Sequence, residues 1–190
     1  MLSKYKPQIE QNLQSVAKHL KWMNPNVLTL IGIIPQALFF YFMHQHQFAA
    51  AAAALVFSCI DMLDGLIARA TSRVTAFGGF LDSTMDRVSD FLLIAGFYYA
   101  GLIRLETFLI LLGVSYLISY VRSRAELASN NAIKFDVGLI ERPERIIFLL
   151  AVVVLQIFLP GYAESLVWIL ILLSVITLFQ RVWMAYRKLD

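Results

Sequence analysis

Hydrophobic residues occur in long runs along this chain, and short polar stretches separate the runs. Six runs can be drawn, at residues 26–44, 48–70, 77–101, 104–127, 140–159 and 162–186. Each has about the 20 residues that a helix needs to cross the roughly 30 Å hydrocarbon core of a bilayer. The pattern therefore predicts an all-α integral membrane protein with six transmembrane helices.

Residues 4–22, ahead of the first run, have a different pattern. Apolar residues recur there at helical spacing, opposite a basic face; they are Ile9, Leu13, Val16, Ala17 and Leu20. Such a segment favours the membrane surface over the membrane interior. Asn24-Pro25-Asn26 then interrupts the pattern and begins the first spanning helix. We expect an amphipathic interfacial helix over residues 1–23 and a six-helix membrane domain over residues 24–190.

Composition and charge support this fold class and give it an orientation. Apolar residues make up 59% of the 190 residues, and the mean hydropathy is +0.70, which excludes an ordinary soluble domain. The lone Cys59 excludes an intramolecular disulfide. If the N-terminus lies inside, every Lys and Arg except Arg104 falls on the cytoplasmic side. We therefore expect a multi-pass protein of the cell membrane with both termini in the cytoplasm.

Four aspartates lie in this apolar sequence, where a carboxylate is costly and usually functional. Asp61 and Asp64 are three residues apart, and Asp82 and Asp86 are four apart, so each pair shares one helix face. Two neighbouring helices can therefore direct four carboxylates at one point. Four negative charges match two Mg²⁺ ions, or Mn²⁺, a pair suited to the transfer of a phosphorus centre. The alternative is structural ion pairing with nearby arginines, which is disfavoured because buried charges need close compensation.

Glycine, alanine and arginine residues occur at defined spacings from the four aspartates. The pattern Asp61-x-x-Asp64-Gly65-x-x-Ala68-Arg69-x8-Gly78-x3-Asp82-x3-Asp86 resembles the complete signature of the CDP-alcohol phosphotransferases. The resemblance implies six transmembrane helices, a homodimer, and an active site at the cytoplasmic end that holds two metal ions. It also implies that an alcohol displaces CMP from a CDP-linked lipid.

The resemblance implies a role for each matching residue. Asp61, Asp64, Asp82 and Asp86 would hold the metals, and Asp86 would also deprotonate the acceptor hydroxyl. The CDP-lipid would be bound by Asp64, Gly65, Ala68, Arg69 and Gly78, with Asn26 and Thr29 of the motif Pro-Asn-x-x-Thr assisting. A metal-bound carboxylate is a weak base, so Asp86 would have to act through a free oxygen or change its ligation.

The second half of the chain bears on the acceptor alcohol. Five arginines are expected at the inner membrane face: Arg122, Arg124, Arg142, Arg145 and Arg181. Several arginines suit a phosphate dianion, and Arg145 lies in the first turn of a predicted helix that begins near Pro143. An alternative role for any one arginine is to anchor anionic lipid head groups. Arg124 points away from Ser119 and Arg122 on an ideal helix, so its participation needs a frayed helix end.

Several stretches of this half are similar to the inositol-phosphate-using branch of the family. These stretches are Ile118-Ser119-Tyr120, Arg124-Ala125-Glu126, residues 138–145, Ser174-Val175-Ile176-Thr177 and Gln180-Arg181. The resemblance implies an inositol-phosphate pocket formed by Ser119, Arg122, Arg124, Pro143, Arg145 and Arg181. Arg122 replaces the lysine that is common in the bacterial members, which leaves open whether the lipid carries diacylglycerol or archaeol.

These observations predict transfer of a phosphatidyl-type group from CDP-diacylglycerol or CDP-archaeol to myo-inositol 1-phosphate, with release of CMP. The expected partners are the CDP-linked lipid, inositol 1-phosphate, membrane lipids and a second copy of the chain, with no nucleic acid. Glycerol 3-phosphate is the alternative acceptor, whereas the arginines argue against serine. A cation-coupled transporter is the alternative class. It is disfavoured because the outer halves of four predicted helices are nearly free of ionisable groups and no inverted repeat is visible.

Overall fold

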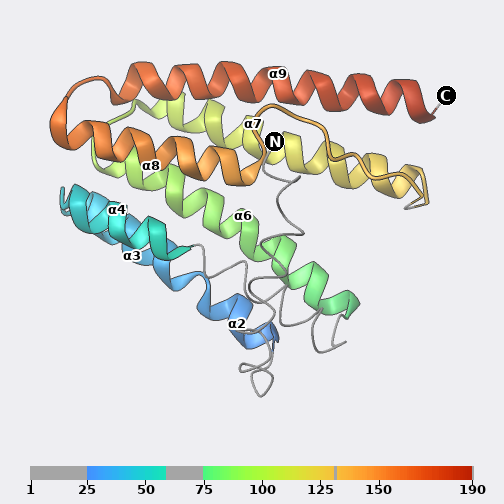
Figure 1. Cartoon of the computed structure of the whole chain (residues 1–190), viewed down its shortest axis with the longest axis horizontal. Helices are drawn as coiled ribbons and strands as arrows, with labels where there is room; N and C mark the ends of the chain where they lie inside the picture. Colours follow the sequence, from blue (N-terminus) through green and yellow to red (C-terminus); the bar gives the residue numbers. More distant parts are fainter. Residues whose placement is uncertain (1–24, 59–74, 131, 190) are drawn as a thin grey trace, which may run out of the picture. The chain divides into compact units, whose positions relative to one another are not determined.

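The structure is a computed structural model that describes residues 25–58, 75–130 and 132–189. All regular structure in these ranges is helical (Figure 1). The helices are α2 (Pro25–Ile31), α3 (Ile34–His44), α4 (Phe48–Phe57), α6 (Ala76–Tyr99), α7 (Leu105–Ala128), α8 (Arg142–Phe158) and α9 (Ala163–Leu189). The described residues up to Gly96 belong to one compact unit, and those from Phe97 onward belong to a second. The predicted all-helical fold is thus confirmed for the described part of the chain.

Four of the six predicted segments match α6, α7, α8 and α9 within a few residues at each end. Among the described helices, α7 and α9 are long and apolar enough to cross a membrane, with 24 and 27 residues and hydropathies of 1.4 and 2.0. The second predicted segment is described only as far as Ser58, and the predicted interfacial helix over residues 1–23 lies outside the described residues. The number of membrane spans therefore stays a prediction.

The first predicted helix is interrupted, in contrast to the expectation of one continuous segment over residues 26–44. α2 ends at Ile31, and α3 begins at Ile34 with Pro35 in its first turn. Proline has no N–H to donate and its ring clashes with the carbonyl four residues earlier, so it is accommodated where a helix begins. Gly32, the least restrained residue, occupies the interruption. A hydropathy pattern cannot predict this break, because every residue from 30 to 34 is apolar or glycine.

In the first unit, α3 and α4 form a helical hairpin and α6 packs against α3. The turn at residues 45–47 uses a left-handed residue, His46, with a φ of 55°. Phe39 and Met43 of α3 are fully buried. A Cβ atom on Gly96 would lie 2.9 Å from the ring of Phe39, so this glycine permits close approach of α6 to α3.

In the second unit, α7 and α8 both pack against α9. The contact faces are apolar, with Leu111 of α7, Leu149 of α8 and Leu170 of α9 almost completely buried. Small polar residues, Ser115 and Ser174, are also fully buried. Much of the remaining surface of α7 and α9 is apolar and exposed, as expected for helices that face lipid.

Glu164, in the first turn of α9, connects the beginnings of α7 and α9. One carboxylate oxygen accepts the Arg104 N–H at 2.9 Å, immediately before α7 begins. The other accepts the Thr107 hydroxyl at 2.6 Å and the Trp168 indole N–H at 3.2 Å. A helix begins with backbone N–H groups that lack helical partners, so this carboxylate caps α7 from a neighbouring helix.

We expect Glu164→Ala to destabilise the protein, because the α7 start loses its acceptor and buried Thr107 loses its partner. Loss of a helix cap costs about 0.5–2 kcal/mol, which lowers the Tm by a few degrees. Thermal unfolding in detergent measures this. Glu106→Ala is the matched control, because Glu106 is an exposed carboxylate in the first turn of α7. Equal Tm values for the two variants would contradict the capping role.

Candidate active site

The predicted metal ligands lie only partly within the described residues. Asp61 and Asp64 lie outside them, as do Gly65, Ala68 and Arg69. Asp82 and Asp86 are one turn apart on α6, with Asp82 exposed and Asp86 half-buried. The described residues contain no group of three or more His, Cys, Asp or Glu that could hold a metal ion. The four-carboxylate site therefore stays a prediction, with two of its members on one face of α6.

A third acid, Asp90, extends the face formed by Asp82 and Asp86. Arg87 lies between two of these acids, with its guanidinium 3.6 Å from the Asp86 carboxylate and 3.8 Å from that of Asp90. The Asp90 side chain is 1% exposed, whereas that of Asp86 is 23% exposed. Burial and a counterion indicate that Asp90 has a structural role, while the more accessible oxygens are those of Asp82 and Asp86. The sequence analysis did not single out Asp90, although the i, i+4 repeat from Asp82 to Asp90 is visible in it.

The beginning of α6 brings two predicted nucleotide-binding residues together. The Gly78 N–H donates to the Thr75 hydroxyl at 2.9 Å, so Thr75 caps the helix. A Cβ atom on Gly78 would lie 3.2 Å from the Asn26 side-chain oxygen, so Asn26 of α2 lies directly beside this glycine. Thr29 is one turn further along α2 and is half-buried. The contact supports the assignment of Asn26 and Gly78 to one site, with Thr75 as a neighbour that the sequence analysis missed.

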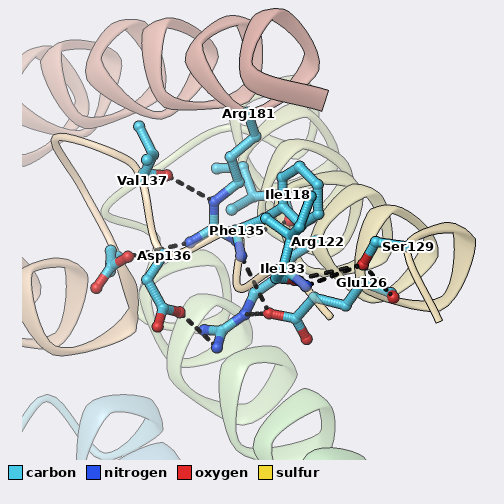
Figure 2. A network of polar contacts seen from close by, with 10 residues as sticks. Ile118, Arg122, Glu126, Ser129, Ile133, Phe135, Asp136, Val137 and Arg181 are labelled. Carbon is cyan, nitrogen blue, oxygen red and sulfur yellow. Dashed lines mark hydrogen bonds and ion pairs between the residues drawn. The ribbon is translucent and has the colours of Figure 1, made fainter. Parts of the chain in front are cut away.

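In the second unit, two of the predicted acceptor arginines join one polar network (Figure 2). Arg122 of α7 donates from Nε to Glu126 at 3.0 Å and pairs with Asp136 through Nη2. Arg181 of α9 donates from Nε to the Val137 carbonyl and from Nη1 to the Ile118 carbonyl, both at 2.9 Å.

A third carboxylate completes this network. Arg181 also pairs with Glu141, with 3.3 Å between Nη2 and Oε1. The two arginines are thus matched by three carboxylates, those of Glu126, Asp136 and Glu141, and by two carbonyl groups.

The other predicted acceptor residues differ in their exposure. Arg145, in the first turn of α8, is 3% exposed, and Pro143 lies at the beginning of the same helix. The Ser119 hydroxyl donates to the Ser115 carbonyl at 3.3 Å. Arg124 is exposed, and α7 continues past it to Ala128, so the helix is intact at the position where participation of Arg124 would need it to be frayed. The sequence analysis did not identify Asp136 or the Val137 carbonyl, because contacts of a loop backbone leave no periodic signal in a sequence.

The chain is similar to known proteins over almost all of its length. Residues 22–180 match the CDP-alcohol phosphatidyltransferase family. The archaetidylinositol phosphate synthase of Pyrococcus horikoshii is 41% identical over 194 residues, which cover 100% of this chain and 99% of the relative. The phosphatidylinositol phosphate synthase of Mycobacteroides abscessus is 37% identical over 83% of this chain and 74% of the relative.

Solved structures show the same relationship. The crystal structure of Mycobacterium tuberculosis phosphatidylinositol phosphate synthase with CDP-DAG bound superposes with a TM-score of 0.77 and 32% identity, over 91% of this chain and 92% of that one. The same enzyme in complex with manganese and citrate superposes with a TM-score of 0.74 and 33% identity, over 94% and 88% of the two chains. The chain therefore belongs to the CDP-alcohol phosphatidyltransferase family, as its sequence signature predicts.

Proposed function

We propose that this protein transfers a phosphatidyl-type group from a CDP-linked lipid to the hydroxyl of myo-inositol 1-phosphate and releases CMP. The observation that carries the proposal is the full-length match at 41% identity to a protein named archaetidylinositol phosphate synthase. A second relative of the same name is 35% identical over 100% of this chain. The related structure with CDP-DAG bound supports a CDP-lipid as donor. The buried arginines of α8 and α9 support a phosphorylated acceptor.

Asp61, Asp64, Asp82 and Asp86 are the proposed holders of two Mg²⁺ ions, with Mn²⁺ as an alternative. Carboxylate oxygens are the donors that these cations prefer, and Asp82 and Asp86 present theirs one turn apart on α6 without full burial. The manganese complex of the related enzyme supports a divalent cation. When bound, the cations would neutralise the diphosphate and the leaving CMP.

Residues of the chain would accept the proton of the acceptor hydroxyl and orient the two substrates. The acceptor oxygen attacks the lipid-proximal phosphorus, the bond from that phosphorus to the CMP oxygen breaks, and the hydroxyl proton passes to Asp86. The Arg87 guanidinium, 3.6 Å from the Asp86 carboxylate, is a positive group beside this proposed base. Asn26, Thr29, Gly65, Ala68, Arg69 and Gly78 are the proposed binding residues for the CDP-lipid.

Ser119, Arg122, Pro143, Arg145 and Arg181 are the proposed residues for the acceptor phosphate, whereas Arg124 would join them only if the end of α7 frayed. A guanidinium has five N–H groups, and the three bonds of Arg181 to the protein leave two for a ligand. Arg145 adds a buried positive charge at the beginning of a helix, where the helix dipole also favours an anion.

The proposed setting is a homodimer in the cell membrane, with six spans in each chain and both termini and the active site on the cytoplasmic side. Helices α7 and α9, long and apolar enough to cross a membrane, support two of these spans. The asymmetry of Lys and Arg in the sequence supports the orientation.

We expect Asp82→Asn to abolish CMP release from CDP-diacylglycerol and from CDP-archaeol, because an amide is a poorer ligand for a hard cation. Saturating Mg²⁺ or Mn²⁺ will not restore turnover. The matched control is Ser83→Ala, which loses only a 2.9 Å hydrogen bond to the Gly79 carbonyl of the same helix. Full activity of Asp82→Asn at saturating Mg²⁺ would remove Asp82 from the metal site.

Asp86→Asn separates proton transfer from binding. If Asp86 is both ligand and base, kcat will fall by orders of magnitude, while the KM for the CDP-lipid changes much less. Steady-state kinetics with each substrate varied in turn measure both parameters. A raised KM with an unchanged kcat would assign the proton to another group.

Arg145→Gln tests the identity of the acceptor. Loss of one charged contact costs about 1.5–3 kcal/mol, so the KM for inositol 1-phosphate is expected to rise about ten- to a hundredfold. The KM for the CDP-lipid is expected to change little. Arg187→Gln is the control, because Arg187 lies over the Trp183 ring, 5.1 Å from its centroid, at the end of α9.

The same assay includes glycerol 3-phosphate and unphosphorylated inositol as acceptors. A wild-type preference for glycerol 3-phosphate would keep the phosphate pocket and overturn the proposed acceptor. Equal losses of both substrates in Arg145→Gln would show that this buried arginine supports the fold.

A further inference from the structure

The connection between α7 and α8, residues 133–141, contains no regular structure and is nevertheless bound to α7 and α9 along its length. Phe135 is fully buried, and its N–H donates to Glu126 of α7 at 3.4 Å. The next contacts are to α9, through the Val137 carbonyl and the Ile140 N–H. Figure 2 shows this α7–α8 connection beside Arg122 and Arg181. A loop with this many directed contacts has a defined position.

Thr177 of α9 fits the α7–α8 connection by hydrogen bonding and by shape. Its side chain is fully buried, and its hydroxyl accepts the Ile140 N–H at 3.0 Å while donating to the Leu173 carbonyl at 3.0 Å. Its methyl group faces Gly138 so closely that a Cβ atom at position 138 would overlap it. A side chain at position 138 would therefore force either the Thr177 side chain or the connection to shift.

The α7–α8 connection bears the charged partners of the proposed acceptor arginines. Asp136 pairs with Arg122, and Glu141 pairs with Arg181. Glu141 is also the residue at which the connection becomes α8, since its carbonyl accepts the Arg145 N–H at 3.0 Å. The position of the connection thus sets the surroundings of Arg122, Arg145 and Arg181 together.

The contacts differ in how strongly they can hold the connection. The side chains of Arg122 and Asp136 are 41% and 44% exposed, and an ion pair in water contributes little. The side chains of Thr177 and Phe135 are fully buried, and the hydrogen bonds made by Thr177 Oγ1 and the Phe135 N–H are partly buried, so they compete less with solvent than the exposed ion pair does. The buried contacts therefore fix the connection, and the exposed pair follows from its position.

We infer that Thr177 is a positioning residue for acceptor binding, because it fixes the α7–α8 connection through Gly138 and Ile140. It acts through Arg122, Arg145 and Arg181 and contacts no substrate itself. The inference rests on the proposed function, since these arginines are the proposed ligands of the acceptor phosphate.

Two substitutions separate the hydroxyl from the methyl group. Thr177→Val keeps the shape and removes the acceptor of the Ile140 N–H, whereas Thr177→Ser keeps the hydroxyl. We expect the KM for inositol 1-phosphate to rise about tenfold in Thr177→Val, which corresponds to the loss of one partly buried hydrogen bond. The KM for the CDP-lipid is expected to change less than twofold. Thr177→Ser is expected to match the wild type in both values.

A second measurement needs no activity. Lys134 is exposed in the α7–α8 connection, so trypsin can report the fraction of time that the connection is released. Cleavage after Lys134 is expected to be about tenfold faster in Thr177→Val and in Gly138→Ala than in the wild type. Thr177→Ser and Gly113→Ala are the controls, because a Cβ atom on Gly113 meets no atom within 4 Å.

The possible outcomes distinguish the inference from the proposed function. Unchanged KM and unchanged cleavage in Thr177→Val would overturn the inference alone. Equal rises in the KM of both substrates would also overturn it, because Thr177 would then support the fold as a whole. A wild-type protein that releases no CMP with inositol 1-phosphate would overturn the proposed function. In that case faster cleavage would show only that Thr177 fixes the connection, without a role in acceptor binding.

Discussion

The arrangement of the second unit depends on one constraint, which is that a guanidinium buried among apolar helices must be satisfied by the protein. Arg181 is 4% exposed. Leaving such a charge without partners would cost several kcal/mol. Its partners come from three places: the Ile118 carbonyl of α7, the Val137 carbonyl of the α7–α8 connection, and the Glu141 carboxylate where α8 begins. One side chain of α9 therefore fixes the relative positions of the other elements of this unit.

The three acids of α6 have the same spacing in the sequence, but they differ in burial, and the difference indicates different roles. Asp82, Asp86 and Asp90 repeat at i, i+4 on one helix face. Asp90 is almost completely buried beside Arg87, whereas Asp82 is exposed and Asp86 is partly accessible. A cation that exchanges with solvent needs accessible oxygens, so Asp82 and Asp86 suit a metal site. Asp90, which is buried, suits a structural ion pair. Arg87 contacts both Asp86, a proposed metal ligand, and Asp90, the structural acid.

The sequence predicts the helices well because their signal is long and repeated. The ends of α6 to α9 fall within a few residues of the hydrophobic runs. The interruption between α2 and α3 was missed because it depends on Gly32 and Pro35 within an uninterrupted apolar run. In the candidate site, the family resemblance predicts which acids and arginines take part, and these roles stay predictions. The docking of Thr177 against Gly138 could not be predicted, because it depends on the tertiary fit of a loop that has no periodicity of its own.

Arg122 and Arg181 were equivalent candidates in the sequence, but the structure places them in different surroundings, which would suit different roles in the proposed binding of a phosphate. The pair of Arg122 with Asp136 is about 40% exposed and contributes only about 0–1 kcal/mol, so an incoming dianion can replace the carboxylate at small cost. The bonds of Arg181 are buried and directed at carbonyl groups, so exchanging them would leave unsatisfied acceptors. In the proposed site Arg181 would therefore offer only the two N–H groups that these bonds leave, in an orientation that the fold has already fixed. If both arginines bind the acceptor phosphate, the fixed position of Arg181 would reduce the entropy lost on binding, and the exposed guanidinium of Arg122 would exchange its carboxylate partner for the phosphate.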